Sequence, residues 1–140
     1  MAMSLGMEQR GQDRTVSRVR SDLLAWLAVI AVAIGGAWWL FFPGVPIGHD
    51  LTMHIYRVQA LDQHLRAGVL YPRWFEHFVF GYGYPLLHFY APLFYYLGVG
   101  FHWLGLSYVD AFKAVCLFSR VIGGLATYHF ARARLSSRWA

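Results

Sequence analysis

The stretch LLAWLAVIAVAIGGAWWLFF, residues 23–42, decides how this sequence is interpreted. It runs for twenty residues without a charge. A helix that rises about 1.5 Å per residue over this length matches the ~30 Å hydrocarbon core of a bilayer. Trp38 and Trp39 suit a membrane interface, and Pro43 with Gly44 ends the helix. The sequence therefore predicts a transmembrane helix over 23–42.

The composition of the whole chain favours the same class. Of its 140 residues, 58% are hydrophobic and only 14% are charged, whereas soluble domains carry roughly 25% charged residues. A cleaved signal peptide is the alternative for residues 23–42. The apolar run is too long for one and no small-residue cleavage site follows it, so we expect an uncleaved anchor.

Arginines predict the topology. Four of them precede the first span, which places segment 1–22 in the cytoplasm under the positive-inside rule. Others follow a second apolar run, which we interpret as a transmembrane helix over 111–131 with a cytoplasmic end at 132–140. The net charge of +5 resides mainly in these end clusters, so we expect no nucleic-acid partner.

The region between the spans, 43–110, is expected to form an outer loop with interfacial or re-entrant helices. Residues 85–106 are apolar enough to cross as well, but a third span would deliver the last arginines to the wrong side. The predicted fold is an all-α integral membrane protein with two or three transmembrane helices and an outer hairpin. Its expected location is the inner (plasma) membrane, as a multi-pass protein in contact with the lipid bilayer.

An amphipathic helix is predicted just after the first span. In DLTMHIYRVQALDQHLR, residues 50–66, Ile55 and Val58 share an apolar side while His54 and Arg57 fall mostly on another. Gly68 is expected to end this helix, which would lie along the membrane surface.

The titratable residues of GHDLTMH, 48–54, are the candidate catalytic groups. Asp50 and His54 are four residues apart, so their side chains can meet on one helix face. Such a carboxylate, tuned by burial and by the imidazole, can take a proton from a hydroxyl. The alternative is that Asp50 caps the helix N-terminus. The two interpretations are compatible.

Metal binding is a weaker hypothesis for the same residues. His49, Asp50 and His54 are all ligand types, but no fourth ligand is evident and their spacing matches no zinc signature. We assign no metal ligand from the spacing, and a divalent metal stays open as a cofactor.

Arg120 and the aromatic residues of the outer loop can each be interpreted as functional or as structural. Arg120 inside the second span can bind the phosphate of a lipid carrier, or it can extend its side chain to the interface. The many aromatic residues between 71 and 96 offer faces on which sugar rings stack, or they form an interfacial belt.

Several motifs in a fixed order resemble a known family. GHDLTMHIYRVQALDQHLRAGVLYPRW (48–74), GYGYPLLHFYAPLFYYLG (81–98) and RVIGGLATYHFARAR (120–134) are similar to the N-terminal region of bacterial membrane proteins related to 6-pyruvoyl-tetrahydropterin synthase. Those proteins look like relatives of the GT-C glycosyltransferases, which include the protein O-mannosyltransferases. The resemblance covers roughly residues 23–138.

The resemblance implies a function and a set of site residues. Asp50 takes the place of an essential acid in the first outer loop, with His54 beside it, and would help remove the acceptor's proton. Arg120 matches an arginine that contacts the donor phosphate. The donor would be a polyprenyl-phosphate sugar. The substrate-binding residues within the shared motifs are Arg73, Trp74, Tyr82 and Tyr84.

This sequence differs from the family pattern in two ways that limit the activity expected of it. Leu51 stands where many relatives carry a second acid, which weakens the case for a metal. Such enzymes are several times longer, so we expect an N-terminal fragment that is inactive by itself and needs missing C-terminal helices or a partner subunit. The alternatives are a non-catalytic small integral membrane protein or a transporter fragment.

Overall fold

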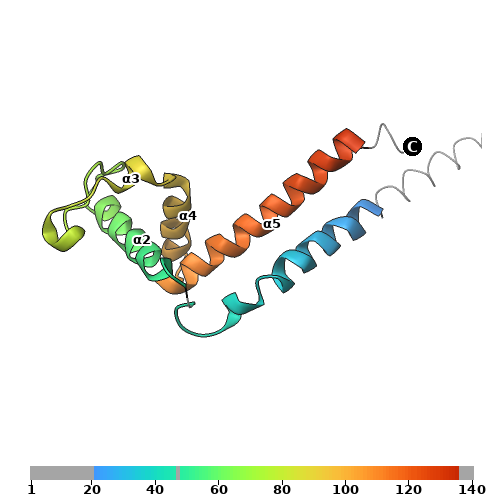
Figure 1. Cartoon of the computed structure of the whole chain (residues 1–140), viewed down its shortest axis with the longest axis horizontal. Helices are drawn as coiled ribbons and strands as arrows, with labels where there is room; N and C mark the ends of the chain where they lie inside the picture. The colour runs from blue at the N-terminus through green and yellow to red at the C-terminus, as the bar shows by residue number, and fades with distance from the viewer. Residues whose placement is uncertain (1–20, 47, 136–140) are drawn as a thin grey trace, which may run out of the picture. The chain divides into compact units, whose positions relative to one another are not determined.

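The structure is a computed structural model that describes residues 21–46 and 48–135 of the chain (Figure 1). Most of the predicted segment 1–22, and residues 136–140 of the predicted C-terminal end, lie outside the described residues. The elements are a helical segment over 21–35, the 3₁₀ turns η1 (Trp38–Phe41) and η2 (Val79–Gly81), and the helices α2 (Leu51–Arg66), α3 (Leu86–Phe89), α4 (Pro92–Trp103) and α5 (Tyr108–Leu135).

The prediction of an integral membrane fold, and with it the multi-pass inner-membrane location, is wrong. Among residues 21–46 and 48–135, no helix combines the length and the apolar composition that a bilayer crossing requires. The first apolar run stops being α-helical at residue 35, before a turn over residues 36–37 and the 3₁₀ turn η1. Helix α5 is long, but Lys113, Arg120 and His129 interrupt its apolar residues.

The segment 85–106, considered as a third span, also proves to be divided. It forms the four-residue helix α3 and the twelve-residue helix α4, separated by Tyr90 and Ala91. Tyr90 is extended, and Pro92 occupies the start of α4, where its missing N–H is tolerated. Pro85 thus precedes α3, and Pro92 begins α4.

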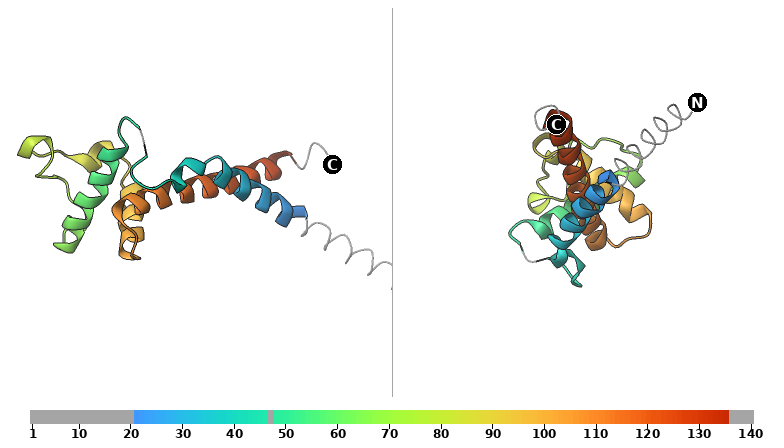
Figure 2. Two further views of the ribbon diagram at one scale, coloured as in Figure 1. Left: turned by 90° about the horizontal axis from the view of Figure 1, so that it is seen from below. Right: turned by 90° about the vertical axis from the view of Figure 1, so that its right-hand side faces the viewer.

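The chain divides into two compact units. The first unit comprises residues 21–37 and 120–135 of the described chain, and the second unit comprises residues 38–119 apart from residue 47. Figure 2 shows α5 as one uninterrupted helix, so its first residues belong to the second unit and its remainder to the first.

In the first unit, two helical segments are joined by side chains near one end. Asp22 accepts hydrogen bonds from Arg132 and from the hydroxyl of Tyr128, the latter at 3.4 Å. The rings of Trp26 and His129 meet edge to face at 5.4 Å. An ion pair and an aromatic contact therefore hold residues 21–35 against the last turns of α5.

Helix α2 confirms the prediction of a helix over residues 50–66. It ends where the sequence indicated: Gly68 has φ +84°, a left-handed conformation that glycine adopts at low cost. The N–H of Gly68 bonds to the Leu65 carbonyl at 3.0 Å, and the N–H of Val69 to the His64 carbonyl at 2.9 Å. These bonds satisfy carbonyl groups that the helix end would otherwise leave open.

The core of the second unit lies between α2 and α4, which pack against each other. Residues from the intervening loop and from α3 complete it. The buried side chains of this core are Val58, Leu61, Phe75, Leu86, Leu87, Tyr95 and Val99. Arg57 and Asp62 are also buried on α2, so the buried face of this helix differs from the purely apolar one expected.

An aromatic loop projects from this core. Phe75 and Tyr84 exchange two backbone hydrogen bonds of 3.0 Å, which close the loop over residues 75–84. At its tip, Val79 and Phe80 both have positive φ values, 55° and 58°, and the Phe80 side chain is fully exposed. Positive φ is costly for such residues, so the closed loop holds Phe80 outward against a local preference.

Candidate functional site

Asp50 precedes the first residue of α2 and is exposed. Its carbonyl accepts the N–H of His54 at 3.0 Å, but its side chain makes no capping hydrogen bond. Neither a hydrogen bond nor an ion pair joins its carboxylate to the imidazole of His54. Asp50 is therefore an accessible carboxylate one helical turn from His54, at the capping position but without the capping bond.

His54 faces the interior of the second unit. Its Nδ1 lies 3.0 Å from the Tyr95 hydroxyl and 3.5 Å from Nη1 of Arg57. A guanidinium can only donate, so both contacts fit an Nδ1 that carries no proton and accepts. Burial and the nearby Arg57 lower the pKa of His54, and the attraction of Asp50 opposes this shift only in part. The environment favours a neutral imidazole at pH 7.

A cavity of about 350 Å³ opens beside His54. This volume lies at the lower end of the ~300–1,000 Å³ that is typical of small-molecule sites. Its walls come from α2, from the segment before α4, from α4 and from α5, and they are mostly apolar. The lining residues are Leu51, His54, Tyr90, Ala91, Phe94, Tyr95, Phe112 and Cys116.

Arg57 lies next to this cavity and was not among the predicted site residues. Its Cζ sits 4.0 Å above the centre of the Tyr90 ring, and its Nη1 lies 3.5 Å from Nδ1 of His54. Burial acts to lower the pKa of Arg57, but the interactions with Tyr95 and Tyr90 outweigh it and raise the pKa. Arg57 is therefore a permanent positive charge among aromatic side chains.

Asp62 forms a second polar cluster on the same helix. Its side chain is 2% exposed. Its carboxylate accepts hydrogen bonds from Arg66 Nε at 2.8 Å and 3.0 Å, from Trp103 Nε1 at 2.6 Å and from the Tyr108 hydroxyl at 2.7 Å. His102 Nε2 lies 3.9 Å away. One carboxylate thereby links α2, the last residue of α4 and the first residue of α5.

Burial by itself would raise the pKa of Asp62, but the hydrogen bonds from Arg66, Tyr108 and Trp103 outweigh it and lower the pKa. The charged form accepts all of these bonds at once. Since every oxygen of this carboxylate is occupied by neighbours within the fold, the cluster is structural. It does not present a reactive group.

Four predicted substrate-binding residues belong to the aromatic loop or its base. Arg73, Trp74 and Tyr82 are exposed, while Tyr84 is half-buried and stacks on Phe89 with ring centres 5.8 Å apart. The indole of Trp74 covers Gly83, because a Cβ there would meet its Nε1 at 2.0 Å. None of the four lines the His54 cavity, so the loop and the cavity are separate surfaces of the second unit.

Arg120 belongs to the first unit, where its side chain is exposed. Its Nη2 would lie 2.5 Å from a Cβ at Gly36, so the missing side chain of that glycine leaves room for the guanidinium. It borders a groove of about 590 Å³ that is lined mostly by residues with small side chains. The other lining residues are Ala28, Val29, Val32, Ala33, Gly123, Gly124, Thr127, Tyr128 and Ala131.

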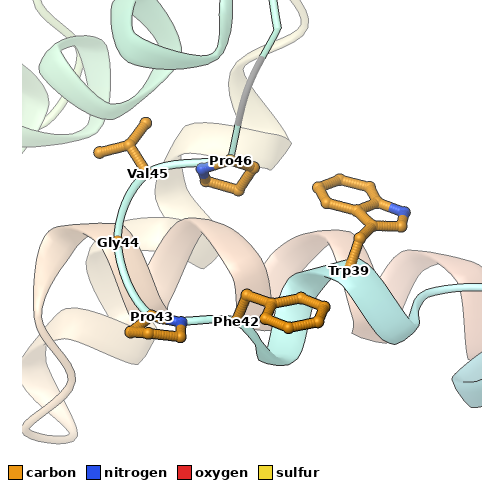
Figure 3. Close-up of a pocket in the computed structure, with 6 residues that line it drawn as sticks. All are labelled: Trp39, Phe42, Pro43, Gly44, Val45 and Pro46. Carbon is orange, nitrogen blue, oxygen red and sulfur yellow. The ribbon is translucent and has the colours of Figure 1, made fainter.

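The described residues contain no candidate metal site, and the pocket at the turn after η1 offers no reactive group. Within the part of the chain that the structure describes, no group of three or more His, Cys, Asp or Glu side chains is placed to hold a metal ion. A pocket of about 400 Å³ lies at the turn over 42–46, and Figure 3 shows the residues that line it, which are Trp39, Phe42, Pro43, Gly44, Val45 and Pro46. Apart from the Trp39 indole N–H, these lining side chains are apolar.

The residues that sequence reasoning missed are Arg57 and Asp62. Asp62 and Arg66 stand at the i, i+4 spacing of a helical ion pair, and that signal was available. The placement of Trp103 and Tyr108 around Asp62 depends on how α2, α4 and α5 meet, as does the position of Tyr90 under Arg57. No sequence pattern predicts these contacts between distant segments.

The fold and the site together define a helical protein with an aromatic cavity, an accessible acid and a buried cation on one helix. Comparisons of the chain with protein families, with curated proteins and with solved structures find no match. The relation to GT-C glycosyltransferases therefore stays an expectation from the quoted motifs.

Proposed function

We propose that this chain is part of a glycosyltransferase-like protein that transfers a sugar from a polyprenyl-phosphate donor to an acceptor hydroxyl. The supporting observation is the relation of Asp50 to the cavity. An accessible carboxylate precedes α2 by one residue, and His54, one turn further on, lines a cavity with aromatic walls. The motif resemblance gives Asp50 the role of the acid that acts on the acceptor.

In the proposed reaction, Asp50 accepts the proton of the acceptor hydroxyl. The acceptor oxygen attacks C1 of the sugar from the face opposite the phosphate, and the bond between C1 and the phosphate oxygen breaks. Polyprenyl phosphate leaves with the electron pair, so the anomeric configuration is inverted. Because a general base contributes roughly 10²–10⁴-fold to such a step, Asp50 is the residue with the largest expected effect on the rate.

The cavity is suited to the sugar itself. Tyr90 and Tyr95 offer ring faces and hydroxyls in its walls, and sugars present apolar ring faces edged by hydroxyl groups. His54, neutral and with Nδ1 engaged as an acceptor, carries its proton on Nε2 and would donate one hydrogen bond from there to the sugar. Asp50 is open to solvent, so exclusion of water requires further helices or a partner subunit. We expect residues 1–140 by themselves to be inactive.

The test is the loss of transfer when Asp50 is replaced by Asn. A strain of the source organism that lacks the gene is complemented with the complete native reading frame, carrying either no change, Asp50→Asn or Asp110→Asn. Transfer from radiolabelled polyprenyl-phosphate sugar is then measured in extracts. We expect Asp50→Asn to lower it at least 100-fold. The control acid, Asp110, is exposed, bonds to Ser107 and lies outside the cavity, so its variant should retain transfer. Equal transfer by both variants, at equal protein levels, would refute the proposal.

The aromatic loop supports a second candidate, a non-catalytic binding function. Phe80 is fully exposed in a closed loop whose backbone is held at positive φ, and exposed aromatic residues with backbone strain are common at interaction sites. In this case Phe80→Ser would abolish the biological effect of the gene, whereas Asp50→Asn would leave it unchanged. The two variants therefore separate the two functions.

A further inference from the structure

Arg57 is a buried cation without an acidic partner. Only 9% of the residue is exposed, yet it forms no ion pair with any carboxylate in residues 21–46 and 48–135. Its contacts are the ring of Tyr90 and Nδ1 of His54, which in turn lies 3.0 Å from the Tyr95 hydroxyl. All of these groups are electrically neutral, since the environment of His54 favours the unprotonated imidazole.

The other arginines with strong contacts differ in this respect. Arg66 bonds to the carboxylate of Asp62, and Arg132 bonds to that of Asp22. The Arg66 side chain is more than half exposed. Water therefore stabilises its charge, and a counter-ion matters less for Arg66 than for the buried Arg57. Charge buried without a counter-ion is unfavourable, and stacking on an aromatic ring offsets the cost only in part. An anion beside Arg57 would remove this imbalance.

The guanidinium retains capacity for a ligand. It has five N–H donors, and in the described residues its hydrogen bonding is confined to Nη1, which lies 3.5 Å from Nδ1 of His54. No enclosed side-chain nitrogen of the described residues lacks a hydrogen-bond partner. Nε and Nη2 of Arg57, which make no hydrogen bond within the described residues, are therefore not completely enclosed.

The position of that cation next to the cavity defines the rest of the ligand. His54 and Tyr90, which contact Arg57, line the 350 Å³ cavity, as does Tyr95, which bonds to His54. The remaining walls are apolar and come from Leu51, Ala91, Phe94, Phe112 and Cys116. A ligand that satisfies both features has an apolar or ring-shaped body and one negatively charged group.

We propose that Arg57 binds the oxyanion, a phosphate or a carboxylate, of a small ligand whose ring-shaped body occupies the cavity beside His54, Tyr90 and Tyr95. A planar guanidinium matches both oxyanions in a bidentate geometry. This site shares its cavity with the sugar of the proposed transfer, but its test depends on Arg57 and requires neither Asp50 nor an acceptor. Failure of transfer would leave it intact, and failure of anion binding would leave the role of Asp50 intact.

The test uses four probes and the protein of residues 1–140. Phenyl phosphate and benzoate carry both a ring and an oxyanion, whereas inorganic phosphate and phenol each carry one of the two. Affinities are measured by isothermal titration calorimetry. We expect phenyl phosphate or benzoate to bind at least tenfold more tightly than either half-ligand, and the tighter of the two identifies the oxyanion. If neither exceeds phenol and inorganic phosphate, the proposal is wrong.

Two variants test the role of Arg57. Arg57→Gln should lower the affinity for the tighter probe at least tenfold, while Arg134→Gln, an exposed arginine in the other unit, should leave it unchanged. Equal affinities in wild type and a folded Arg57→Gln variant would overturn the proposal.

The single cysteine provides a readout that needs no variant. Cys116 lines the cavity, and burial raises the pKa of its thiol. The tighter probe should slow its alkylation by iodoacetamide at least fivefold in the wild-type protein, and phenol at the same concentration should not. Equal alkylation rates with and without a bound probe would show that the anion binds elsewhere. That result would refute the site even if Arg57→Gln failed to fold.

Discussion

Replacing Asp62 by Asn is expected to lower the free energy of unfolding by about 3 kcal/mol at pH 7. Hydrogen bonds to a charged group contribute roughly 1.5–3 kcal/mol each, and loss of one partner in a buried ionic cluster costs about 3–5 kcal/mol. In the wild type, Arg66 Nε and the Tyr108 hydroxyl donate hydrogen bonds to Oδ2 of Asp62. The Asn amide keeps one acceptor oxygen but places an NH₂ group, itself a donor, opposite these two donors. Urea denaturation followed by tryptophan fluorescence measures the change.

The pH dependence of this effect has a definite sign. The pKa of Asp62 is lowered in the folded protein, so the stabilisation from its charge is fully present above the unfolded pKa of about 3.9. It is lost as the pH falls through the folded pKa, which lies below that value. The difference in stability between wild type and Asp62→Asn should therefore be constant near neutral pH and shrink in acid below about pH 4.

Asp110→Asn is the matched control for Asp62→Asn. Asp110 is also an aspartate at the junction of α4 and α5, but it is exposed and its side chain bonds to Ser107. Its replacement should change the stability by less than about 1 kcal/mol. If the two Asn variants unfold at the same urea concentration, Asp62 does not stabilise the junction of these helices.

Gly98→Val should destabilise the second unit by about 3 kcal/mol, at the upper end of the usual cost of overpacking a core. Gly98 is buried on α4 where that helix meets α2. A Cβ at this position would lie 2.9 Å from Cγ2 and 3.1 Å from Cγ1 of Val58, which is itself fully buried. Val58 is β-branched and has little rotamer freedom within a helix, so α2 and α4 would have to separate. Urea denaturation at pH 7 measures the loss.

The control lies two residues further along the same helix. A Cβ at Gly100 would meet nothing within 4 Å, so Gly100→Ala adds a methyl group in open space. Because alanine favours helix more than glycine does, this variant should gain up to about 1 kcal/mol. Opposite signs for the two substitutions are expected. A stabilising effect of Gly98→Val would show that α2 and α4 do not depend on a small residue at their contact.

Local structure was predictable where it depends on neighbours in the sequence. The end of α2 at Gly68 follows from the left-handed conformation that glycine permits, and the break before α4 follows from Pro92. The membrane assignment failed because it treated the apolar run 23–42 as one element. Its helix ends within the Gly35–Gly36 pair, and η1 is a separate 3₁₀ turn. Apolar composition does not specify how far a helix continues.

The candidate site was predictable only in part. Asp50 and His54 stand out because titratable residues in a mostly apolar chain are conspicuous, and His54 does line a cavity. The hydrogen bond that their spacing permits does not form, since the imidazole of His54 contacts Tyr95 of α4, 41 residues away. Arg57 was placed on the polar side of the helix and Asp62 was not singled out, yet both are buried.

By itself, the sequence determined where α2 begins and ends and where α4 begins, because glycine, proline and side-chain periodicity act through the backbone of adjacent residues. Only the tertiary structure decided which polar residues of α2 became buried and what they contact. That outcome depends on the packing of α2 against α4 and the start of α5, which brings Tyr90, Tyr95, Trp103 and Tyr108 to Arg57 and Asp62. Desolvation and hydrogen bonding between distant segments arise from that packing, and no periodicity within one segment encodes them.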